Sequence, residues 1–471
     1  WGIAIYFVFG NLEMLGKFSG IAEITPLHIG DWPIIDGRHV YYLIWAVTLA
    51  ALFAIRNLLN SRAGRAIRTL KGRGLMAESF GVDTSRLKIK IFLYAALLAS
   101  LSGWLYAHYL RYVSPSPFSI NASIDYLFMA VIGGSAQVWG AVIGAGVLTL
   151  LKEWLKDLLP KLIEQSGNYE IIVFGLLIML LLHRTREGLA PYAMRLFPSA
   201  EKCAPPKAEP LPARTQPAAG EELLSVRQAT KTFGALIAVN ALSFEMRAGE
   251  IVGLIGPNGA GKSTMFNLIT GVLPANDGEV RFRGERIDGL PGRDISRRGV
   301  ARTFQHVNIL AHASVLDNAA IGAHLRGEAG VIAASLRLER KEEQRLLAEA
   351  ARQLERVGLG EHLFDPAGSL ALGQQRMLEI ARALSADPTL LLLDEPAAGL
   401  RHREKQALAE LLRKLRSGGM SILLVEHDMD FVMGLVDRIV VMNFGEKLAE
   451  GVPRDIQSNE AVIEAYLGGV A

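Results

Sequence analysis

The residues most suited to chemistry lie in a glycine-rich run at 256–264, Gly-Pro-Asn-Gly-Ala-Gly-Lys-Ser-Thr. The run follows a short apolar segment at 251–255 and leads into a helix-like segment at 264–268. A strand, a glycine loop and a helix N-terminus in this order allow backbone N–H groups and the helix dipole to bind phosphate. The run therefore predicts a nucleotide site for ATP. We expect the contacts to come from Gly256, Asn258, Gly259, Gly261, Lys262, Ser263 and Thr264.

Two carboxylates, Asp394 and Glu395, directly follow an apolar run at 390–393 that reads as a buried strand. A carboxylate at the end of a buried strand beside a phosphate loop is placed to hold Mg²⁺, which suits Asp394 together with the hydroxyl of Ser263. The adjacent Glu395 can accept a proton from an attacking water. This pair predicts that the chain hydrolyses ATP.

Three further features are candidates for the same site. His427 ends a strand-like run at 422–425 and can donate a hydrogen bond to the γ-phosphate, although a lone histidine there is more often structural. Phe233 lies upstream of the glycine run and can stack on adenine, or be an ordinary surface or core residue. A turn at Gly373 and Gln374 opens a helix, and a helix N-terminus attracts anions.

The elements that must position these residues fall into two parts of different composition. The chain has 471 residues, of which 50% are hydrophobic, and is long enough for two or three domains. About 20 apolar residues are needed to cross a bilayer. The long uncharged runs lie at 40–55, 91–110, 126–151 and 171–182. We predict a transmembrane portion at 1–190, an extended, solvated Pro/Ala-rich linker at 191–221, and a domain of alternating strands and helices at 222–471.

The charges of the loop at 56–73 set the predicted orientation. The loop carries Arg and Lys without an acid, so it should be cytoplasmic. The stretch at 65–81, which adds small residues and one acid, is by itself interpreted as a solvated basic loop. Because the ATP-binding half must also be cytoplasmic, the run at 126–151 cannot be one span. It should reverse at Gly133-Gly134-Ser135, either crossing the bilayer twice or re-entering. The segment at 152–164 then reads as an amphipathic interfacial helix.

The net charge and the cysteine content narrow the class of protein and its compartment further. A net charge of +3 is too small to imply a nucleic-acid partner. Cys203 is the single cysteine, which excludes an internal disulfide and fits a reducing compartment. The chain opens at Trp1 without a basic region ahead of an apolar core, so we expect no signal peptide, and we expect further spans upstream.

The order of these elements resembles the ABC ATPase family. The matching stretches are the glycine run at 256–264, Thr303-Phe304-Gln305-His306, Leu370-Ala371-Leu372-Gly373-Gln374-Gln375-Arg376, Asp394-Glu395-Pro396 and Glu426-His427-Asp428. The resemblance implies catalytic roles for Glu395, His427 and Gln305, and places Gln305 beside Mg²⁺ as well. It also implies that the turn at Gly373 and Gln374 binds ATP held by a second ATPase subunit. Ala371 and Leu372 stand where the generic pattern has Ser and Gly, and the alanine resembles the variant common in ATPases of branched-chain amino acid importers.

The first half resembles the C-terminal part of the permease of that system. The matching stretches are Ala77-Glu78-Ser79-Phe80-Gly81, the Gly133-Gly134 break, Phe174-Gly175-Leu176 and Arg184-Thr185-Arg186-Glu187-Gly188-Leu189. The chain thus resembles a fused permease–ATPase, an α-helical transmembrane portion followed by an α/β P-loop ABC ATPase domain. In this family a short helix matching 74–81 docks on the ATPase near its glutamine loop.

The resemblance implies ATP-driven import of branched-chain or hydrophobic amino acids by a multi-pass protein of the inner (plasma) membrane, with the ATPase domain cytoplasmic. The implied partners are a second permease subunit, a second ATPase subunit, an extracytoplasmic solute-binding protein and the lipid bilayer. Urea and short amides are carried by close relatives, so an importer of either is an open alternative. An exporter half-transporter and a soluble ABC ATPase of translation or repair fit the sequence less well.

Overall fold

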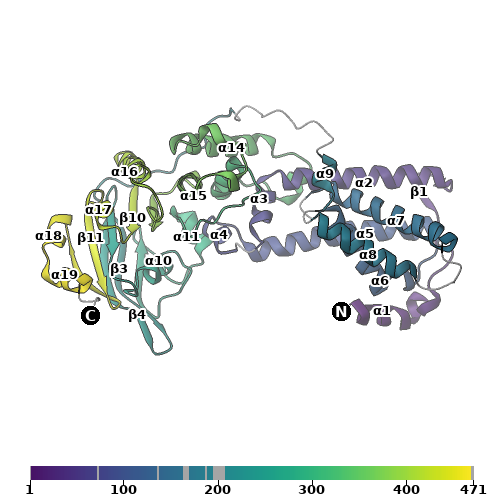
Figure 1. Cartoon of the computed structure of the whole chain (residues 1–471), viewed down its shortest axis with the longest axis horizontal. Coiled ribbons are helices and arrows are strands. Elements are labelled where there is room, and N and C mark those ends of the chain that lie inside the picture. The colour runs from purple at the N-terminus through teal and green to yellow at the C-terminus, as the bar shows by residue number, and fades with distance from the viewer. Residues whose placement is uncertain are drawn as a thin grey trace. The chain divides into compact units, whose positions relative to one another are not determined.

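The computed structural model describes residues 2–71, 74–134, 137–162, 169–185, 188–194 and 207–467 (Figure 1). The chain forms two compact units. The first comprises Trp1–Asn57 and Ile91–Cys203, and the second comprises Leu58–Lys90 and Ala204–Ala471. The loop at 58–90, which is inserted between two helices of the membrane portion, therefore packs with the ATP-binding half. The division into a membrane portion, a linker and an ATPase stays a prediction from the sequence.

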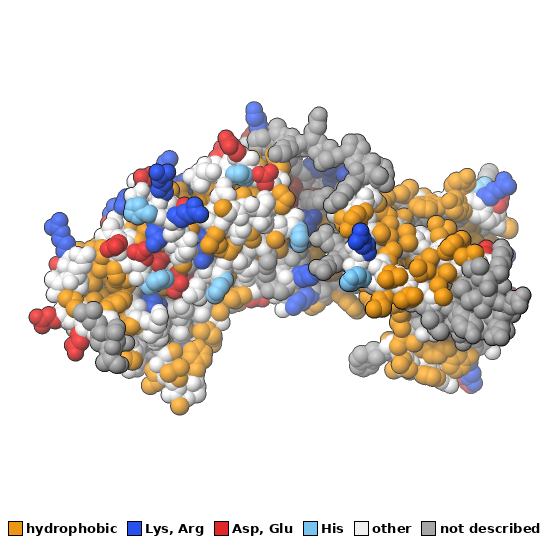
Figure 2. Space-filling view, viewed as in Figure 1, with side chains coloured by type: hydrophobic (Ala, Val, Ile, Leu, Met, Phe, Trp, Pro, Cys, Tyr) orange, Lys and Arg blue, Asp and Glu red, His pale blue; other side chains and the backbone are white. Residues whose placement is uncertain are grey.

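Helices dominate the first unit. Among the described residues, α2 and α5 are long and apolar enough to cross a membrane, and they contain the predicted runs at 40–55 and 91–110. Both helices expose apolar side chains, including Tyr41, Phe53, Phe92 and Leu97, and hydrophobic groups cover much of this unit in Figure 2. The elements are α1 (Gly2–Asn11), η1 (Glu13–Leu15), η2 (Lys17–Ser19), β1 (Leu27–Ile29), β2 (Trp32–Ile34), α2 (Gly37–Leu59), α5 (Thr84–Leu110), η3 (Ser116–Phe118), α6 (Ile120–Gly133), α7 (Gly140–Leu162), α8 (Tyr169–Arg184) and α9 (Ala190–Met194).

The run at 126–151 is divided between α6 and α7, so the prediction that it is not a single span is confirmed. A Cβ on Gly144 would overlap the carbonyl oxygen of Met129, and one on Gly133 would overlap that of Gly140. The two helices therefore form an antiparallel pair whose backbones touch, which only small residues permit. Ser135 lies outside the described residues.

The separate interfacial helix predicted at 152–164 is wrong for its described part. Residues 152–162 are the last turns of α7, and 163–164 lie outside the described residues. Lys152 pairs with Asp125 of α6 at 2.6 Å. The charged residues thus continue an existing helix and join it to its neighbour, because a change from apolar to amphipathic composition does not by itself end a helix.

Two sheets form the core of the second unit. The six-stranded sheet has the order β12 (Glu446–Gly451), β11 (Arg438–Asn443), β5 (Ile251–Ile255), β10 (Ser421–Val425), β9 (Leu390–Asp394) and β8 (Val300–Arg302). All its pairs are parallel except β11–β12. The antiparallel sheet has the order β4 (Leu236–Arg247), β3 (Glu222–Phe233), β6 (Asp277–Phe282) and β7 (Glu285–Arg286). This confirms the predicted α/β class.

The central strands are apolar throughout because both faces of the parallel sheet are covered. Alternate residues of β9 point to opposite faces: Leu391 and Leu393 pack with α15 and α16, whereas Leu390 and Leu392 pack with α10 and the antiparallel sheet. The other elements of this unit are α3 (Arg62–Thr69), α4 (Gly74–Ser79), α10 (Lys262–Ile269), α11 (Gly292–Arg298), α12 (Val315–Gly322), η4 (Ala323–Arg326), α13 (Val331–Ser335), α14 (Arg340–Arg356), η5 (Gly360–His362), η6 (Ala367–Ser369), α15 (Leu372–Ser385), α16 (His402–Ser417), α17 (Met429–Met433), α18 (Pro453–Gln457) and α19 (Glu460–Leu467).

The linker is extended where the structure describes it, at 207–219, and most of its residues there are exposed as predicted, but it is anchored on the ATPase at a few points. Leu211 is buried, in a cluster with Ala323 and Leu346. The backbone N–H of Arg214 donates to Asp387 Oδ2 at 2.5 Å. This docked linker segment (207–219) lies on the ATPase because Leu211 packs in that cluster and because two of its carbonyl oxygens accept hydrogen bonds from arginines of the ATPase. Residues 195–206 lie outside the described part of the chain.

Candidate active site

The phosphate loop connects β5 to α10 and owes its shape to glycines. Gly256 and Gly261 have φ values of +154° and +97°, which side-chain-bearing residues rarely adopt. A Cβ on Gly256 would overlap the carbonyl oxygen of Met442, and one on Gly261 would overlap that of Ala238. The loop therefore fits against its neighbours only as glycine, and its N–H groups can turn inward. The remaining predicted contacts lie in the same loop and the first turn of α10: Asn258, Gly259, Ser263 and Thr264.

Lys262 opens α10 and folds back over the loop. Its Nζ donates to the carbonyl oxygens of Gly256 at 2.7 Å and Pro257 at 2.9 Å. Burial lowers the pKa of this amine, and the neighbouring Glu395 and Asp394 raise it in part. The ammonium thus lies between the phosphate loop and the two strand-end carboxylates, where a phosphate chain would gain most from it.

Asp394 is the last residue of β9, and only 4% of it is exposed. Burial raises the pKa of its carboxyl group, and Arg302 is the strongest opposing influence. Among the described residues its Oδ1 has no hydrogen-bond partner. A buried carboxylate oxygen without a partner is costly, and a divalent cation would satisfy it.

Glu395 follows in a left-handed backbone conformation, with φ of +47°. Its N–H donates to the carbonyl oxygen of Val425 at 2.8 Å, which ties the turn after β9 to the end of β10. A non-glycine residue held in this region stores about 1–3 kcal/mol of strain and is often found at functional sites. The turn presents the Glu395 carboxylate at the edge of the sheet where the phosphate loop lies.

His427 lies at the same edge, with Nδ1 4.0 Å from Glu395 Oε2 and 61% of its side chain exposed. Glu426, which precedes it, is fully buried and was not predicted as a site residue. Its carboxylate accepts from the N–H of Ala397 at 2.6 Å and from that of His427 at 3.2 Å. Glu426 therefore joins the turns after β9 and β10. A carboxylate directly before a strand-end histidine is the signal that could have identified it.

Gln305 follows β8, and its backbone is held by α15. Arg376 donates to the carbonyl oxygens of Phe304 at 3.0 Å and Gln305 at 2.6 Å, whereas the Gln305 side chain is exposed. Arg376 was not predicted to have this role. It connects α15, the helix that the Gly373–Gln374 turn opens, to the segment that carries Gln305.

The remaining predicted contacts do not join this cluster. Phe233, at the end of β3, is 46% exposed, and Lys231 Nζ lies 5.5 Å from its ring centre. At the start of α15, Gln374 Oε1 accepts from the N–H of Ala371 at 3.1 Å and so caps its own helix. In the part of the chain that the structure describes, no hydrogen bond or ion pair connects the turn at Gly373 and Gln374 to the phosphate loop.

The docking segment (58–90) packs on the helices of the second unit, where Figure 1 shows α3 and α4 near α11 and α15. Met76 and Phe80 are fully buried in the main core cluster. The guanidinium carbon of Arg382 lies 5.3 Å from the Phe80 ring centre, and Arg382 donates to the carbonyl oxygen of Asn308 at 2.7 Å. The predicted docking of 74–81 beside the Gln305 segment is thus present in the structure, although Gly74 follows two residues, 72–73, that lie outside the described part.

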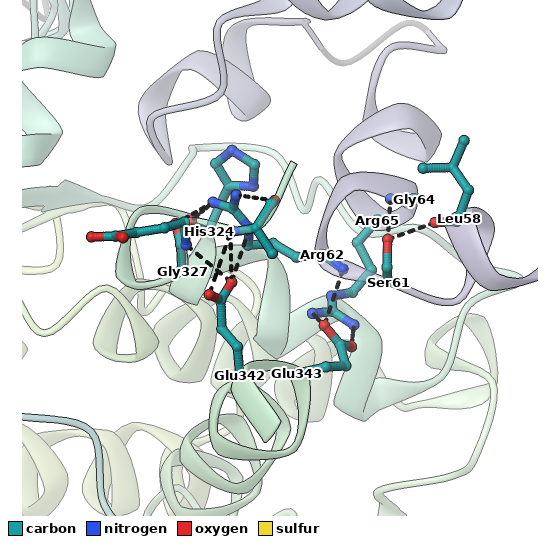
Figure 3. Close-up of polar contacts among 11 residues, drawn as sticks. Leu58, Ser61, Arg62, Gly64, Arg65, His324, Gly327, Glu342 and Glu343 are labelled. Carbon is teal, nitrogen blue, oxygen red and sulfur yellow. Dashed lines mark hydrogen bonds and ion pairs between the residues drawn. The ribbon is translucent and has the colours of Figure 1, made fainter. Parts of the chain in front are cut away.

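The structure adds a second contact, through α3, that the sequence did not predict (Figure 3). Ser61 caps this helix, and its Arg65 is buried against both carboxylate oxygens of Glu343, with Asp317 at 3.8 Å. Arg62 donates to the carbonyl oxygens of His324 at 2.6 Å, Gly327 at 2.5 Å and Ala329 at 2.7 Å. The reading of this stretch as a solvated basic loop is therefore wrong for α3, because its cations pair with α14 and the loop before it.

A phosphate loop, strand-end carboxylates and a docking segment in one unit define an ABC-type ATPase, joined here to a helical portion of a membrane permease. Three family models agree: "ABC transporter" matches 239–398, "Branched-chain amino acid transport system / permease component" matches 1–198, and "Branched-chain amino acid ATP-binding cassette transporter" matches 446–471. The chain belongs to the branched-chain amino acid ABC transporter family, with a permease component and an ATPase in one polypeptide.

Its relatives resemble the second half. A branched-chain amino acid transport ATP-binding protein, LivG, of Salmonella typhimurium is 46% identical over 251 residues, which cover 53% of this chain and 98% of LivG. The corresponding BraF of Pseudomonas aeruginosa is 44% identical over 249 residues, which cover 52% of this chain and 98% of BraF. Among solved structures, an ATP-binding cassette in its ADP conformation is 32% identical with a TM-score of 0.48, and the match covers 52% of this chain and 99% of that one.

Proposed function

We propose that this chain is part of an ATP-driven importer of branched-chain amino acids, located in the inner membrane with its ATPase on the cytoplasmic side. The observation that carries the proposal is the junction of two matched parts: a permease component over 1–198 and an ATPase whose relatives, LivG and BraF, are named for branched-chain amino acid transport. The uncharged runs in α2 and α5 suit a cargo with an apolar side chain.

We call the phosphate loop together with Asp394, Glu395 and His427 the catalytic edge. In this proposal each of its residues has one role. Lys262 and the glycine loop bind the phosphates. Glu395 accepts the proton of the attacking water, and His427 donates to the γ-phosphate. A positioned general base contributes about 10²–10⁴-fold to the rate. The nearness of Lys262, Glu395 and His427 at one edge supports these assignments.

The residues also suit Mg²⁺, which would neutralise charge on the phosphates. Asp394 Oδ1, buried and without a partner among the described residues, is the strongest candidate ligand. The exposed hydroxyl of Ser263 and the exposed side chain of Gln305 complete the proposed set. Hard oxygen donors of this kind are what Mg²⁺ prefers.

We assign the turn at Gly373 and Gln374 to the ATP of a second ATPase subunit. Support comes from its position: it opens α15 and has no bond to the chain's own phosphate loop among the described residues. A second permease subunit and an extracytoplasmic binding protein complete the transporter. The docking segment transmits movement of the ATPase to the spans α2 and α5, because it is continuous with both helices.

The test is transport by the reconstituted complex in proteoliposomes, with ATP on the ATPase side. We expect uptake of radiolabelled leucine that depends on the binding protein and ceases with Glu395→Gln. Uptake of urea or acetamide in place of leucine would overturn the substrate assignment. ATP-driven movement of leucine in the opposite direction, without a binding protein, would overturn import.

A further inference from the structure

The second unit contains a cavity of about 720 Å³ away from the catalytic edge. Three segments line it: the docking segment with the first turns of α5, the helix α11, and the loop at 324–331 that follows α12. Figure 3 shows Arg62 reaching toward the part of this loop that holds His324 and Gly327. The proposed ATPase chemistry uses no residue of this lining, and of the docked stretch 74–81 the lining includes Gly81.

The lining carries more positive than negative charge. Asp83 lies 3.3 Å from both Arg86 and Arg293, so one carboxylate is shared between two cations from different helices. The five basic residues face three carboxylates of the lining, and Arg62 also pairs with Glu342 at 3.9 Å, which leaves one positive charge in excess. The basic residues are Arg62, Arg86, Lys90, Arg293 and Arg297, and the acidic ones are Asp83, Asp294 and Glu328.

The imidazole of His324 lies in the positive electrostatic field of these arginines. Burial lowers the pKa of its imidazole to about 3, and Arg62, Arg65 and Arg297 act in the same direction. The ring is therefore neutral at physiological pH and adds no charge of its own. The positive field of the cavity comes from arginine and lysine, which bind phosphate oxygens well.

Part of the cavity lining belongs to the start of a candidate membrane span. Arg86 and Lys90 lie one helical turn apart on α5, directly before the uncharged run at 91–110. Basic residues at the cytoplasmic end of a span lie at the level of the lipid phosphates and attract anionic lipids. Arg293 and Arg297, which also lie one turn apart, face the cavity from α11 of the ATPase.

We propose that this cavity binds a phosphate group, supplied by the headgroup of an anionic membrane lipid, between α5 and α11. Arg86 and Lys90 hold it from the membrane side, and Arg293 and Arg297 from the ATPase side. Bound there, the lipid joins the docking segment to the ATPase. A soluble phosphate compound has the same chemistry, so the experiment must separate the two sources.

The test measures lipid binding to the full chain in detergent by native mass spectrometry, with phosphatidylglycerol titrated against phosphatidylcholine. Each basic residue near an anionic surface is worth about fivefold in affinity, so Arg86→Gln/Lys90→Gln should bind phosphatidylglycerol about 25-fold more weakly. Arg293→Gln/Arg297→Gln should lose a similar factor. The matched control Arg298→Gln removes a charge of α11 that does not line the cavity, and should change affinity less than about twofold.

The α11 variant, Arg293→Gln/Arg297→Gln, distinguishes binding of the lipid inside the cavity from simple attraction of the lipid to the basic start of α5. If Arg293→Gln/Arg297→Gln binds phosphatidylglycerol like the wild type, or if the control loses as much as the cavity variants, the proposal is overturned. Unchanged ATP binding by each variant shows that it is folded. Neither result depends on transport or hydrolysis, so failure here leaves the proposed import function standing.

A second measurement addresses the soluble source. In Lys262→Ala, whose phosphate loop is disabled, inorganic phosphate and pyrophosphate are tested for a rise in melting temperature without anionic lipid. A rise that disappears with Arg293→Gln/Arg297→Gln supports the cavity with a soluble ligand. No rise, together with cavity-dependent lipid binding, supports the lipid. No cavity-dependent binding in either measurement contradicts the proposal.

Discussion

The catalytic edge and the docking segment lie in the same unit but treat their charges in opposite ways. At the catalytic edge, Asp394 is buried with one oxygen unpartnered among the described residues, and Glu395 is held in a strained conformation. In the docking segment, Arg65 is buried against two acids, and Arg62 donates to three carbonyl oxygens. The first region keeps bonding capacity for a ligand, whereas the two arginines of α3 have used theirs within the chain.

This difference predicts different consequences of substitution. Changes at the catalytic edge should affect turnover while leaving the fold intact, because the unmade bonds there cost stability already. Changes in the docking segment should weaken packing between 58–90 and the ATPase, because breaking a buried ion pair leaves a charge uncompensated. The predictions below test this contrast, from the largest expected effect to the smallest.

Glu395→Gln should lower ATP turnover by about 10²–10⁴-fold and leave ATP binding unchanged, because the base is removed while the phosphate loop remains. Steady-state hydrolysis and equilibrium binding of ATP measure the two effects. Lys262→Ala is the comparison and should lose ATP affinity. If Glu395→Gln lost ATP affinity to the same degree, Glu395 would be structural.

Arg65→Glu should destabilise the docked segment by about 3–5 kcal/mol, because it places a third carboxylate against Glu343 and Asp317. Thermal unfolding of the full chain measures the loss. The exchange variant Arg65→Glu/Glu343→Arg should recover part of it. An exchange variant no more stable than the single one would show that the pair contributes nothing specific.

Leu211→Ala should release the docked linker segment, because it removes about 1.5–3 kcal/mol of apolar burial. Arg326 and Arg345 donate to the carbonyl oxygens of Pro212 and Pro210, so some contacts remain. Limited proteolysis at 207–219 should become faster, and the exposed Thr215→Ala serves as the matched control. Equal cleavage rates in the two variants would indicate that Leu211 does not anchor the segment.

The pH dependence of Asp394 provides the smallest effect. Its raised folded pKa means that the folded chain binds this proton more tightly than the unfolded chain, so the stabilising contribution is present at low pH and is lost as pH rises through the folded pKa. Mg²⁺ should restore stability at higher pH by satisfying the ionised carboxylate. Unfolding measured across pH with and without Mg²⁺ should show this, and Asp394→Asn should abolish the Mg²⁺ response.

The catalytic edge could be predicted from the sequence, whereas the contacts of α3 in the docking segment could not. The phosphate loop, Asp394 and Glu395 act within short stretches, so their spacing reveals them. Arg65 and Glu343 are separated by 278 positions, and no local pattern pairs them. The docked linker segment was missed for the same reason, since its partners lie far away in the chain.

Local patterns also left open which use a residue with two possibilities takes. The side-chain oxygen of Gln374 caps α15, a contact that the sequence did not reveal, and the contact of this turn with the ATP of a second subunit stays a prediction. The amphipathic stretch at 152–162 had the composition of a separate surface helix, yet it continues α7. Composition identifies what a side chain can do, and only packing decides which option it takes.

The central claim is that the docking segment carries movement between the ATPase and the membrane spans. Phe80 packs against Arg382, which binds the carbonyl of Asn308, so the two chain segments are already linked through one side chain. The most direct measurement is a disulfide scan on the Cys203→Ser background, beginning with Ser79→Cys/Asn308→Cys, since a disulfide requires Cα atoms within about 7 Å. The account predicts that a pair between 74–83 and 307–314 cross-links under mild oxidation and that the bond stops transport. It is contradicted if no pair in these ranges cross-links, or if transport continues at full rate with the bond in place.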